Sequence, residues 1–254
     1  MGGPRVAPNS PPRCDVKKQN SVNLKTLLLG LGLSLMLVEQ TLYAQQRDAA
    51  DRNRLAALRA NAERGNAKAK NELGLRCATG LGVATNAAEA VKWFRLAAGQ
   101  NFAAAQFNLG VSYATGQGVA RDVAEAVKWF RKAAEQDLAK AQFNLGLCYK
   151  EGQGVTRDEA KAVRWFRLAA EQNLAVAQYL LGDSYARGHG VAKDEAEAVK
   201  WIALAAAQGM EEARADIPWI KNNMPEKQIA EGKRRAIDWL EKRKRAIAAG
   251  RSPP

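Results

Sequence analysis

The sequence predicts an all-α protein built from stacked helical repeats, and two rows of residues support this. Tryptophan recurs at a fixed step of 36 residues, at Trp93, Trp129, Trp165 and Trp201. Glycine recurs at the same step, at Gly74, Gly110, Gly146 and Gly182. A fixed period of roughly 20–50 residues is typical of proteins in which each repeat packs only on its neighbours. The pattern favours a binding scaffold over a compact enzyme.

The first half of each repeat is predicted to be a helix with a close neighbour. In residues 103–138 this helix covers Ala103 to Thr115 and carries Gly110 at its centre. A glycine inside a helix costs about 1 kcal/mol relative to alanine, so we expect it to allow a second helix to approach closely. Gly116 and Gly118 then mark a loop, because glycine tolerates positive φ.

The second half of each repeat is predicted to be a capped amphipathic helix. Asp122 is a typical N-cap residue, and Glu125 three positions later suggests a capping box. Trp129 and Phe130 lie on one apolar face, so we expect Trp129 to be a buried aromatic residue. Asp137 is expected to end the helix in the left-handed conformation.

Aligning the repeats divides the chain into four regions. Residues 1–44 form a lead-in and a signal segment, and residues 45–66 form an N-terminal capping helix. The last region, 211–254, holds a half repeat in which Pro218 replaces the glycine, a capping helix that starts after Pro225, and a basic tail. Between these lie four complete repeats, at residues 67–102, 103–138, 139–174 and 175–210.

The repeat pattern, A-x-A-Q-x-x-L-G-x-x-Y-x-x-G-x-G-V-x-x-D-x-x-x-A-V-x-W, resembles that of Sel-one-like repeats, which are relatives of tetratricopeptide repeats. The resemblance covers residues 67–210, and the first repeat departs from it at Lys70, Cys77 and Asn86. It implies a right-handed α/α superhelical solenoid that mediates protein–protein interaction. A cysteine-rich secreted branch of the family is associated with β-lactam binding or cleavage. Because this chain lacks the paired cysteines, a related hydrolase is only a remote alternative.

The resemblance also implies that the first helix of each repeat lines the concave groove of the solenoid. Groove-facing positions are those just before the Leu-Gly pair and those one and five residues after its glycine. Asparagine amides at such positions can hold the backbone of an extended peptide, and aromatic rings add apolar contact area. The alternative is that the rings pack only against neighbouring repeats. The candidate groove residues are Phe107, Asn108, Phe143, Asn144, Lys150, Tyr179, Asp183 and Arg187.

The net charge of +13 leaves a second class of partner open. Residues 67–210 contribute 18 basic and 14 acidic side chains, so most of the excess lies elsewhere. The segment from Lys233 to Arg245 is rich in basic residues and is the candidate surface for nucleic acid or an anionic envelope polymer. No nucleic-acid-binding motif accompanies this charge, so a protein or peptide partner is favoured.

Little in the sequence points to catalysis. Cys77 and Cys148 lie almost two repeats apart, too far for a disulfide, and no metal-ligand spacing is present. His189 is the only histidine, and Ser112 and Ser184 lack a histidine partner. We therefore expect no enzyme activity, no cofactor and no bound metal.

The N-terminal segment predicts export. An apolar run of twelve residues, 27–38, has the length of a signal-peptide core and is short for a membrane span of about 20 residues. Cleavage is expected between Ala44 and Gln45, which gives a periplasmic or secreted protein of a bacterial type. An uncleaved membrane anchor is the alternative. The first 21 residues are rich in Pro, Gly and Ser and are expected to be disordered, and translation starting near Val22 would remove them.

Overall fold

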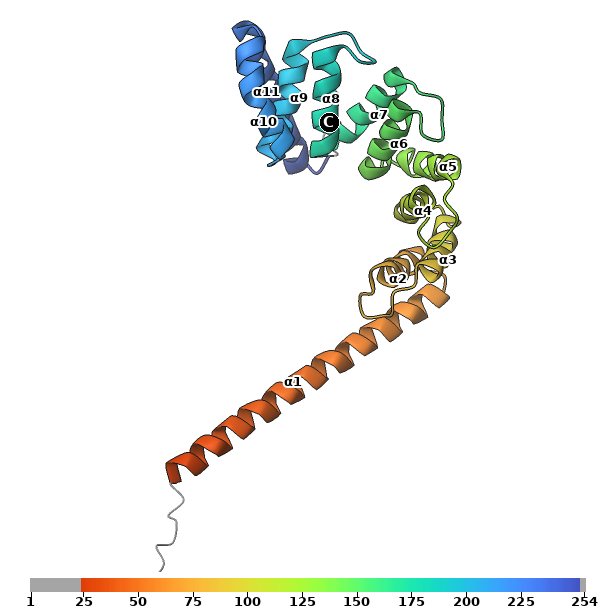
Figure 1. Cartoon of the computed structure of the whole chain (residues 1–254), viewed down its shortest axis with the longest axis vertical. Helices are drawn as coiled ribbons and strands as arrows, with labels where there is room; N and C mark the ends of the chain where they lie inside the picture. The colour runs from red at the N-terminus through yellow and green to blue at the C-terminus, as the bar shows by residue number, and fades with distance from the viewer. Residues whose placement is uncertain (1–23, 252–254) are drawn as a thin grey trace, which may run out of the picture. The chain divides into compact units, whose positions relative to one another are not determined.

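A computed structural model describes residues 24–251, and its helices pair in chain order (Figure 1). The first helix is α1 (Leu24–Glu63), and the last two are α10 (Glu211–Asn223) and α11 (Glu226–Ala248). No strand occurs in the described range, which confirms the all-α prediction. Four helix pairs lie between: α2 (Ala67–Thr79) with α3 (Ala87–Ala98), α4 (Ala103–Thr115) with α5 (Val123–Ala134), α6 (Ala139–Glu151) with α7 (Glu159–Glu171), and α8 (Ala175–Arg187) with α9 (Glu195–Ala207).

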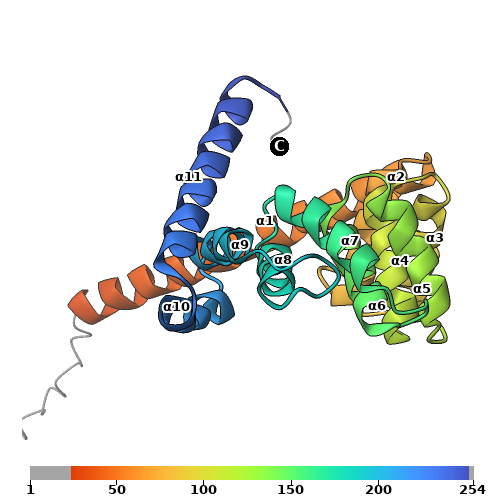
Figure 2. The ribbon, with the colours of Figure 1, turned by 90° about the horizontal axis from the view of Figure 1, so that it is seen from above.

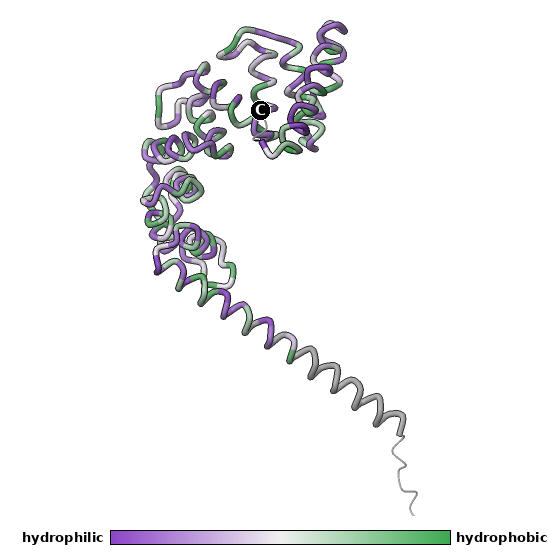
Figure 3. Tube along the Cα trace, turned by 180° about the vertical axis from the view of Figure 1, so that it is seen from behind, coloured by the Kyte–Doolittle hydropathy of each residue, from purple (hydrophilic) through white to green (hydrophobic). Residues whose placement is uncertain are grey.

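Each helix in the paired array packs on the helix before it and the helix after it. The first helix of a repeat contacts the second helix of the same repeat most extensively, and then the second helix of the preceding repeat. Hydrophilic and hydrophobic residues are mixed along these helices (Figure 3), and buried residues of one repeat pack against partly buried residues of the next. The core is therefore a chain of clusters between successive helices, as in an α-solenoid.

The predicted ends of the helices in the second repeat agree with the structure. α4 covers Ala103–Thr115, as the sequence indicated. Asp137 has a φ of 59° and ends the second helix of that repeat, as expected for a residue that tolerates the left-handed region. Asn101, Asn173 and Gly209 do the same in the other repeats, with φ values of 60°, 69° and 92°.

The predicted capping box forms only in part. Asp122 Oδ1 accepts a hydrogen bond from the Glu125 backbone N–H at 2.9 Å, so Asp122 is the N-cap of α5. The Glu125 carboxylate does not return to the Asp122 N–H but pairs with Lys128 Nζ at 2.8 Å. The Asp122 N–H donates instead to the Tyr113 carbonyl at 2.9 Å. The box is incomplete because the end of α4 already satisfies the donor that glutamate would accept from.

The N-terminal helix differs from the expected arrangement. We expected the apolar run to end before a separate capping helix, but α1 continues without a break through Ala44 and Gln45. Residues 39–52 contain neither glycine nor proline, so nothing in their sequence interrupts a helix. Residues 1–52 and 53–254 form two separate units. The predicted disordered lead-in and Cys14 lie outside the described residues.

Within residues 24–251, none of the helices combines the length and the apolar content that spanning a bilayer requires. The predicted signal cleavage stays a prediction.

The last turns of α1 take the place of a preceding second helix. Leu55 and Leu58 pack against the small cluster formed by Ala62, Ala69 and Leu73. Gly65, one repeat length before Asn101, likewise has a positive φ, of 100°. Residues 53–65 therefore cover the apolar face of the first repeat in the way that a repeat would.

The C-terminal helices close the other end of the array. α10 lies one repeat length after α8 and continues through Pro218 to Asn223. α11 packs mainly on α9 (Figure 2). A Cβ at Gly232 of α11 would lie 2.6 Å from the Ala196 carbonyl oxygen of α9, so this glycine lets the two helices approach closely. Trp239 of α11 packs edge to face against Trp201 of α9, with 6.0 Å between the ring centroids, and completes the terminal core.

Candidate functional site

The glycines inside the first helices are packing positions. A Cβ at Gly110 would lie 2.7 Å from the Phe130 ring and 3.2 Å from the Ala126 carbonyl oxygen, both on α5. The expectation of a close helix contact is thus confirmed. The same contact recurs at the other glycines of the row, Gly74 with Phe94, Gly146 with Phe166 and Gly182 with Ile202.

The loop glycines have a role that the sequence analysis missed. Gly118 has a φ of 75°, and a Cβ there would lie 2.0 Å from the Ala87 carbonyl oxygen at the start of α3. Gly154 and Gly190 meet the second helix of their preceding repeat in the same way. Gly82, in the first repeat, meets only an arginine side chain at 3.5 Å, because no complete repeat precedes it. These glycines therefore set the contact between repeats as well as the turn.

The tryptophan row lies between repeats and is less buried than expected. Trp201 is buried, but Trp129 is only half-buried and packs against the core of the preceding repeat. Its ring is covered by Lys132, whose Nζ lies 4.3 Å from the ring centroid, and its indole N–H is buried without a partner. The fully buried aromatic residue is the next one, Phe130. Phe130 therefore lies at the centre of the buried face of α5, and Trp129 lies at the edge of that face.

A row of buried glutamine side chains connects successive repeats and was not recognised in the sequence. Gln142 is 1 % exposed, and its Oε1 accepts a hydrogen bond from Gln172 Nε2 at 2.8 Å. Its own amide donates to the Ala134 carbonyl at 3.3 Å, at the end of the preceding repeat. Equivalent contacts join Gln136 to Gln106 and Gln208 to Gln178, each at 2.7 Å. The glutamine in the repeat motif was the available signal.

The candidate aromatic residues of the groove belong partly to the core. The ring of Phe107 lies 5.8 Å from that of Phe130, and the ring of Phe143 lies 6.0 Å from that of Phe166. Both phenylalanines are half-buried, so they combine packing within their own repeat with an accessible edge. Tyr179 is also half-buried, and its hydroxyl donates to Asp216 Oδ2 at 3.1 Å.

The two candidate asparagines have different surroundings. Asn108 Nδ2 donates to Asn71 Oδ1 at 2.8 Å and so joins the first two repeats. Asn144 Nδ2 donates to the carbonyl of Lys140, one turn earlier on its own helix, at 2.8 Å. A partner can therefore replace the bond of Asn144 to Lys140 without disturbing a contact between repeats, which is not so for the bond of Asn108 to Asn71. A direct role of either residue in binding stays a prediction.

The structure brings three of the candidate residues together around the fourth repeat. Lys150, Asp183 and Arg187 line an open depression of about 580 Å³ together with His189. Arg187 Nε and Asp183 Oδ1 form an ion pair at 2.5 Å. Phe107 and Asn108 belong to α4 and do not line this depression.

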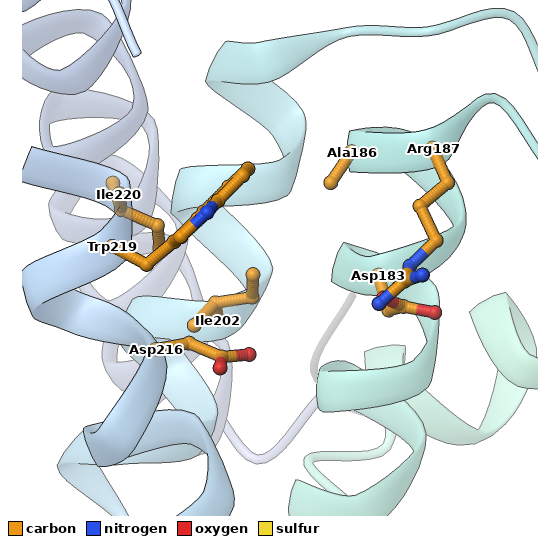
Figure 4. Close-up of a pocket in the computed structure, with 7 residues that line it drawn as sticks. All are labelled: Asp183, Ala186, Arg187, Ile202, Asp216, Trp219 and Ile220. Carbon is orange, nitrogen blue, oxygen red and sulfur yellow. The ribbon is translucent and has the colours of Figure 1, made fainter. Parts of the chain in front are cut away.

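A second hollow lies beside the first, between α8, α9 and α10, and has a volume of about 360 Å³ (Figure 4). Trp219 of α10 stands on one side, Asp183 and Arg187 of α8 stand on the other, and Ile202 of α9 lies between them (Figure 4). We call this hollow the α8–α10 pocket; its lining residues are Asp183, Ala186, Arg187, Ile202, Asp216, Trp219 and Ile220.

Two residues of this pocket were missed because candidate groove positions were taken only from the four complete repeats, and not from the aligned half repeat that starts at residue 211. Trp219 occupies the position one residue after the replaced glycine, which corresponds to Asp183 in the fourth repeat. Asp216 occupies the position of Asn108 and Asn144. The register that selected the groove residues places both residues at groove positions of the half repeat.

The basic residues of the tail are largely committed to contacts within the protein. Arg235 pairs with Asp194, Glu197 and Glu231, and Arg243 donates to the Glu171 carbonyl at 3.0 Å. Arg234 and Arg245 also have acidic partners. The two arginines beside Glu231 lower the pKa of its carboxyl to about 2. Arg234 and Arg245 nevertheless stay exposed, because their ion pairs lie on the surface.

Neither Cys77 nor Cys148 lines either hollow. Cys77 and Cys148 are free thiols, and burial raises the pKa of Cys148 to about 11. Among the described residues, no group of acidic, histidine and cysteine side chains has an arrangement suited to a metal ion.

The comparisons with known proteins agree with the architecture. The Sel1 repeat family model matches residues 67–102, 103–138, 139–174 and 175–210. A protective antigen present in uropathogenic Escherichia coli strains, which displays an SLR fold, is similar to this chain with 45% identity and a TM-score of 0.61. The match covers 63% of this chain and 34% of that one. A search of curated proteins finds no significant match.

A second solved structure, of a Sel1 repeat protein from Oxalobacter formigenes, has 39% identity and a TM-score of 0.57. That match covers 59% of this chain and 62% of the other, so this chain spans less than two thirds of either relative. Proteins with Sel1 repeats are generally protein-interaction scaffolds, typically without catalysis. With four matched repeats over more than half of its length, the chain belongs to the Sel1 repeat family.

Proposed function

We propose that this protein is an exported, non-catalytic scaffold that binds an extended segment of a partner protein along the first helices of its repeats. The main support is that residues at equivalent positions of successive first helices line the same pocket. Asp183 and Trp219 occupy the same position in successive first helices, and both line the α8–α10 pocket. An extended chain has regularly spaced amides and side chains, so it matches a surface built from repeating positions.

The accessible groups on these helices are suited to a peptide. Asn144 offers an amide, Lys150 and Arg187 offer charge, and Phe143 offers the edge of an aromatic ring. Such a mixture of aromatic anchors and polar groups is typical of the residues that contribute most to protein–protein binding. The surface needs no cofactor to act in this way.

Site-specific photocrosslinking tests the location of the partner. A photoreactive amino acid at Asn144 lies on a first helix, and one at Lys92 lies on the exposed side of α3 as a control. We expect an adduct with a partner protein from position 144 and none from position 92. An adduct that forms only from position 92 would place the partner on the second helices and refute the groove.

Substitution then tests the contribution of the groove. Asn144→Ala together with Lys150→Ala is expected to weaken binding of the crosslinked partner by about 1–3 kcal/mol, because polar contacts to the partner are lost. The circular dichroism spectrum should stay unchanged, since the Asn144 amide bonds within its own helix and Lys150 lines an open depression. Normal binding by a folded double variant would contradict the proposal, whereas Lys92→Ala should bind normally.

Export rests on the apolar run at 27–38 and is tested separately. Residues 1–60 fused to a reporter that is active only outside the cytoplasm should give active reporter, and Leu29→Arg should abolish it. An inactive fusion that accumulates uncut in the cytosol would count against export and leave the binding proposal intact.

The alternative of a nucleic acid or an anionic polymer as partner has less support. Four arginines of the tail, Arg234, Arg235, Arg243 and Arg245, are already paired or bonded. Phosphate contacts make affinity fall steeply with salt. A salt titration of partner binding therefore separates the two classes, and a shallow dependence favours the peptide.

A further inference from the structure

We infer that the α8–α10 pocket binds a basic side chain, arginine in preference to lysine, that projects from the bound partner segment. This inference rests on the proposed function and specifies the chemistry of one position in the partner. Its starting point is charge. Two carboxylates, Asp183 and Asp216, and a single cation, Arg187, line the pocket. The pocket is therefore negative within a chain of net charge +13.

The Asp216 carboxylate is available to a ligand. Its Oδ2 accepts one hydrogen bond, from the Tyr179 hydroxyl at 3.1 Å, and it has no ion-pair partner among the described residues. A carboxylate accepts about four hydrogen bonds, so most of the capacity of Asp216 is unused. Burial together with the nearby Asp216, Asp183 and Glu212 raises the pKa of Tyr179, as expected where negative charge is in excess.

The Trp219 ring supplies an aromatic wall. Trp219 is 55% exposed, although Ile220 beside it is buried, and its ring borders the pocket opposite Arg187 (Figure 4). A guanidinium group stacks on the face of tryptophan and donates two parallel hydrogen bonds to a carboxylate. The apolar floor formed by Ile202 and Ala186 suits the methylene stem of such a side chain.

An acidic side chain is a poorer occupant for the same reasons. Arg187 is the cation that would receive it, and Arg187 is already paired with Asp183 at 2.5 Å. An incoming carboxylate would have to break that pair and would also lie near Asp216. A basic side chain can use Asp216 and leave the Asp183–Arg187 pair intact.

The inference is tested first with a defined probe. The probe is the peptide acetyl-Ala-Ala-Arg-Ala-Ala-amide, and the matched peptides carry Lys, Gln or Glu at the centre. Binding to the full chain is followed by NMR at the Trp219 indole N–H, which Trp219→Phe identifies. We expect saturable binding of the Arg peptide, weaker binding of the Lys peptide, and none of the Gln or Glu peptides.

Variants show whether the pocket is responsible. Asp216→Asn keeps an acceptor for Tyr179 but removes the charge, and should weaken the Arg peptide about tenfold. Trp219→Ala, followed on the guanidinium signals of the peptide because the indole is absent, should weaken it severalfold, and Trp219→Phe, measured in the same way, should restore part of the loss. Glu63→Gln removes an exposed acidic charge at the other end of the array and should have no effect. Equal binding of the Arg and Gln peptides, or no effect of Asp216→Asn, would overturn the inference.

A library of random peptides displayed on phage separates this inference from the proposed function. Selection on the full chain should enrich peptides with a basic residue at one position, and selection on Asp216→Asn should lose that preference. Peptides enriched without a basic residue would overturn the pocket assignment and leave the scaffold function standing. Failure to enrich any peptide on either protein would count against both.

Discussion

Gln172 Nε2 donates a hydrogen bond to the buried Oε1 of Gln142 at 2.8 Å. This bond joins the end of α7 to α6, the second and first helices of the third repeat. The same Gln142 amide reaches back to the Ala134 carbonyl of the second repeat at 3.3 Å. One side chain thus satisfies its polar groups on both sides of a repeat boundary. Buried polar groups that find specific partners restrict how neighbouring elements can pack, so this row helps to fix the register of the stack.

Replacing the buried glutamine should destabilise the stack. Gln142→Leu removes these two bonds and a longer one from the Gln142 amide to Asp137 Oδ1 at 3.4 Å, and it leaves the Gln172 amide without its acceptor. We therefore expect a loss of about 1–3 kcal/mol in the free energy of unfolding. Urea denaturation measures it. Gln117→Leu, at an exposed loop position, is the control and should change stability by less than about 0.5 kcal/mol. Equal stability of both variants would show that the glutamine row is dispensable.

The two adjacent aromatic residues of α5 should differ in their contribution to stability. Phe130 is 3% exposed and meets both Gly110 and Phe107, so Phe130→Ala should cost about 3–5 kcal/mol. Trp129→Ala should cost less, because the side chain is half-buried and its indole N–H already lacks a partner. Thermal and urea unfolding of the two variants test the order. A larger loss at Trp129 would show that the contact between repeats outweighs the core within one.

The contact between Gly110 and Phe130 predicts non-additive effects. Gly110→Ala places a methyl group 2.7 Å from the Phe130 ring and should cost about 1–3 kcal/mol. In a Phe130→Ala background the ring is absent, so Gly110→Ala should cost much less, and the Ala126 carbonyl oxygen at 3.2 Å is the close contact that stays. Gly99→Ala is the control, because Gly99 lies away from the Phe130 ring and its φ of −64° suits alanine. Its effect should be the same with and without the Phe130 ring. Simple additivity of the two substitutions would contradict the close approach.

The helices and their ends could be predicted from the sequence because they depend on local signals. The fixed 36-residue step indicates the repeat length. Gly110 and Asp137 each indicate what the backbone requires at one position, a close helix contact and a left-handed φ. The burial of Trp129 could not be predicted in this way. A helical face is wide enough to hold both Trp129 and Phe130, and only the tertiary contact with the preceding repeat decides which ring is enclosed.

The candidate site could be predicted only in part, for a related reason. Asp183 and Arg187 follow from the register of the repeats, and Lys150 lies one residue before the position equivalent to Arg187. The structure brings all three to one depression. Trp219 and Asp216 follow from the same register, but groove positions were not assigned in the half repeat, because Pro218 in place of the glycine marked the end of the array. The continuity of α1 through Ala44 was also missed, because an apolar run and a polar helix share no periodic pattern.

The two described cysteines should differ in reactivity. The thiolate is the reactive form, and a thiol of pKa about 11 is ionised to only about one part in a thousand at pH 8. Cys148 is also buried, whereas Cys77 is half-buried. With Cys14 replaced by serine, mass spectrometry after a short iodoacetamide pulse should show labelling at Cys77 well before Cys148. Both should react at similar rates in urea; equal rates in the native protein would refute the buried position of Cys148.

The acid sensitivity of the helix caps should depend on whether the cap is charged. The Asp158 carboxylate accepts the Lys161 backbone N–H at 2.9 Å and pairs with Lys161 Nζ at 3.0 Å, and these contacts lower its pKa. Because the folded pKa lies below the unfolded one, the native state binds fewer protons in acid. The contribution of Asp158 is therefore present above the ordinary aspartate pKa of about 3.9 and is lost as pH falls through the lowered value.

Exchanging charged and neutral caps between repeats tests this. Asn86 caps α3 in the first repeat with the same bond, from the Glu89 N–H at 3.0 Å, but carries no charge. Asp158→Asn should be less stable than the wild type at pH 7, and the difference should shrink as the pH falls below about 4. Asn86→Asp should gain an acid-dependent contribution that the wild type lacks at that cap. Urea unfolding at pH 7, 4 and 3 provides the comparison. If the stability difference for Asp158→Asn stays constant across this range, the charge of Asp158 does not contribute and its amide replacement caps the helix equally well.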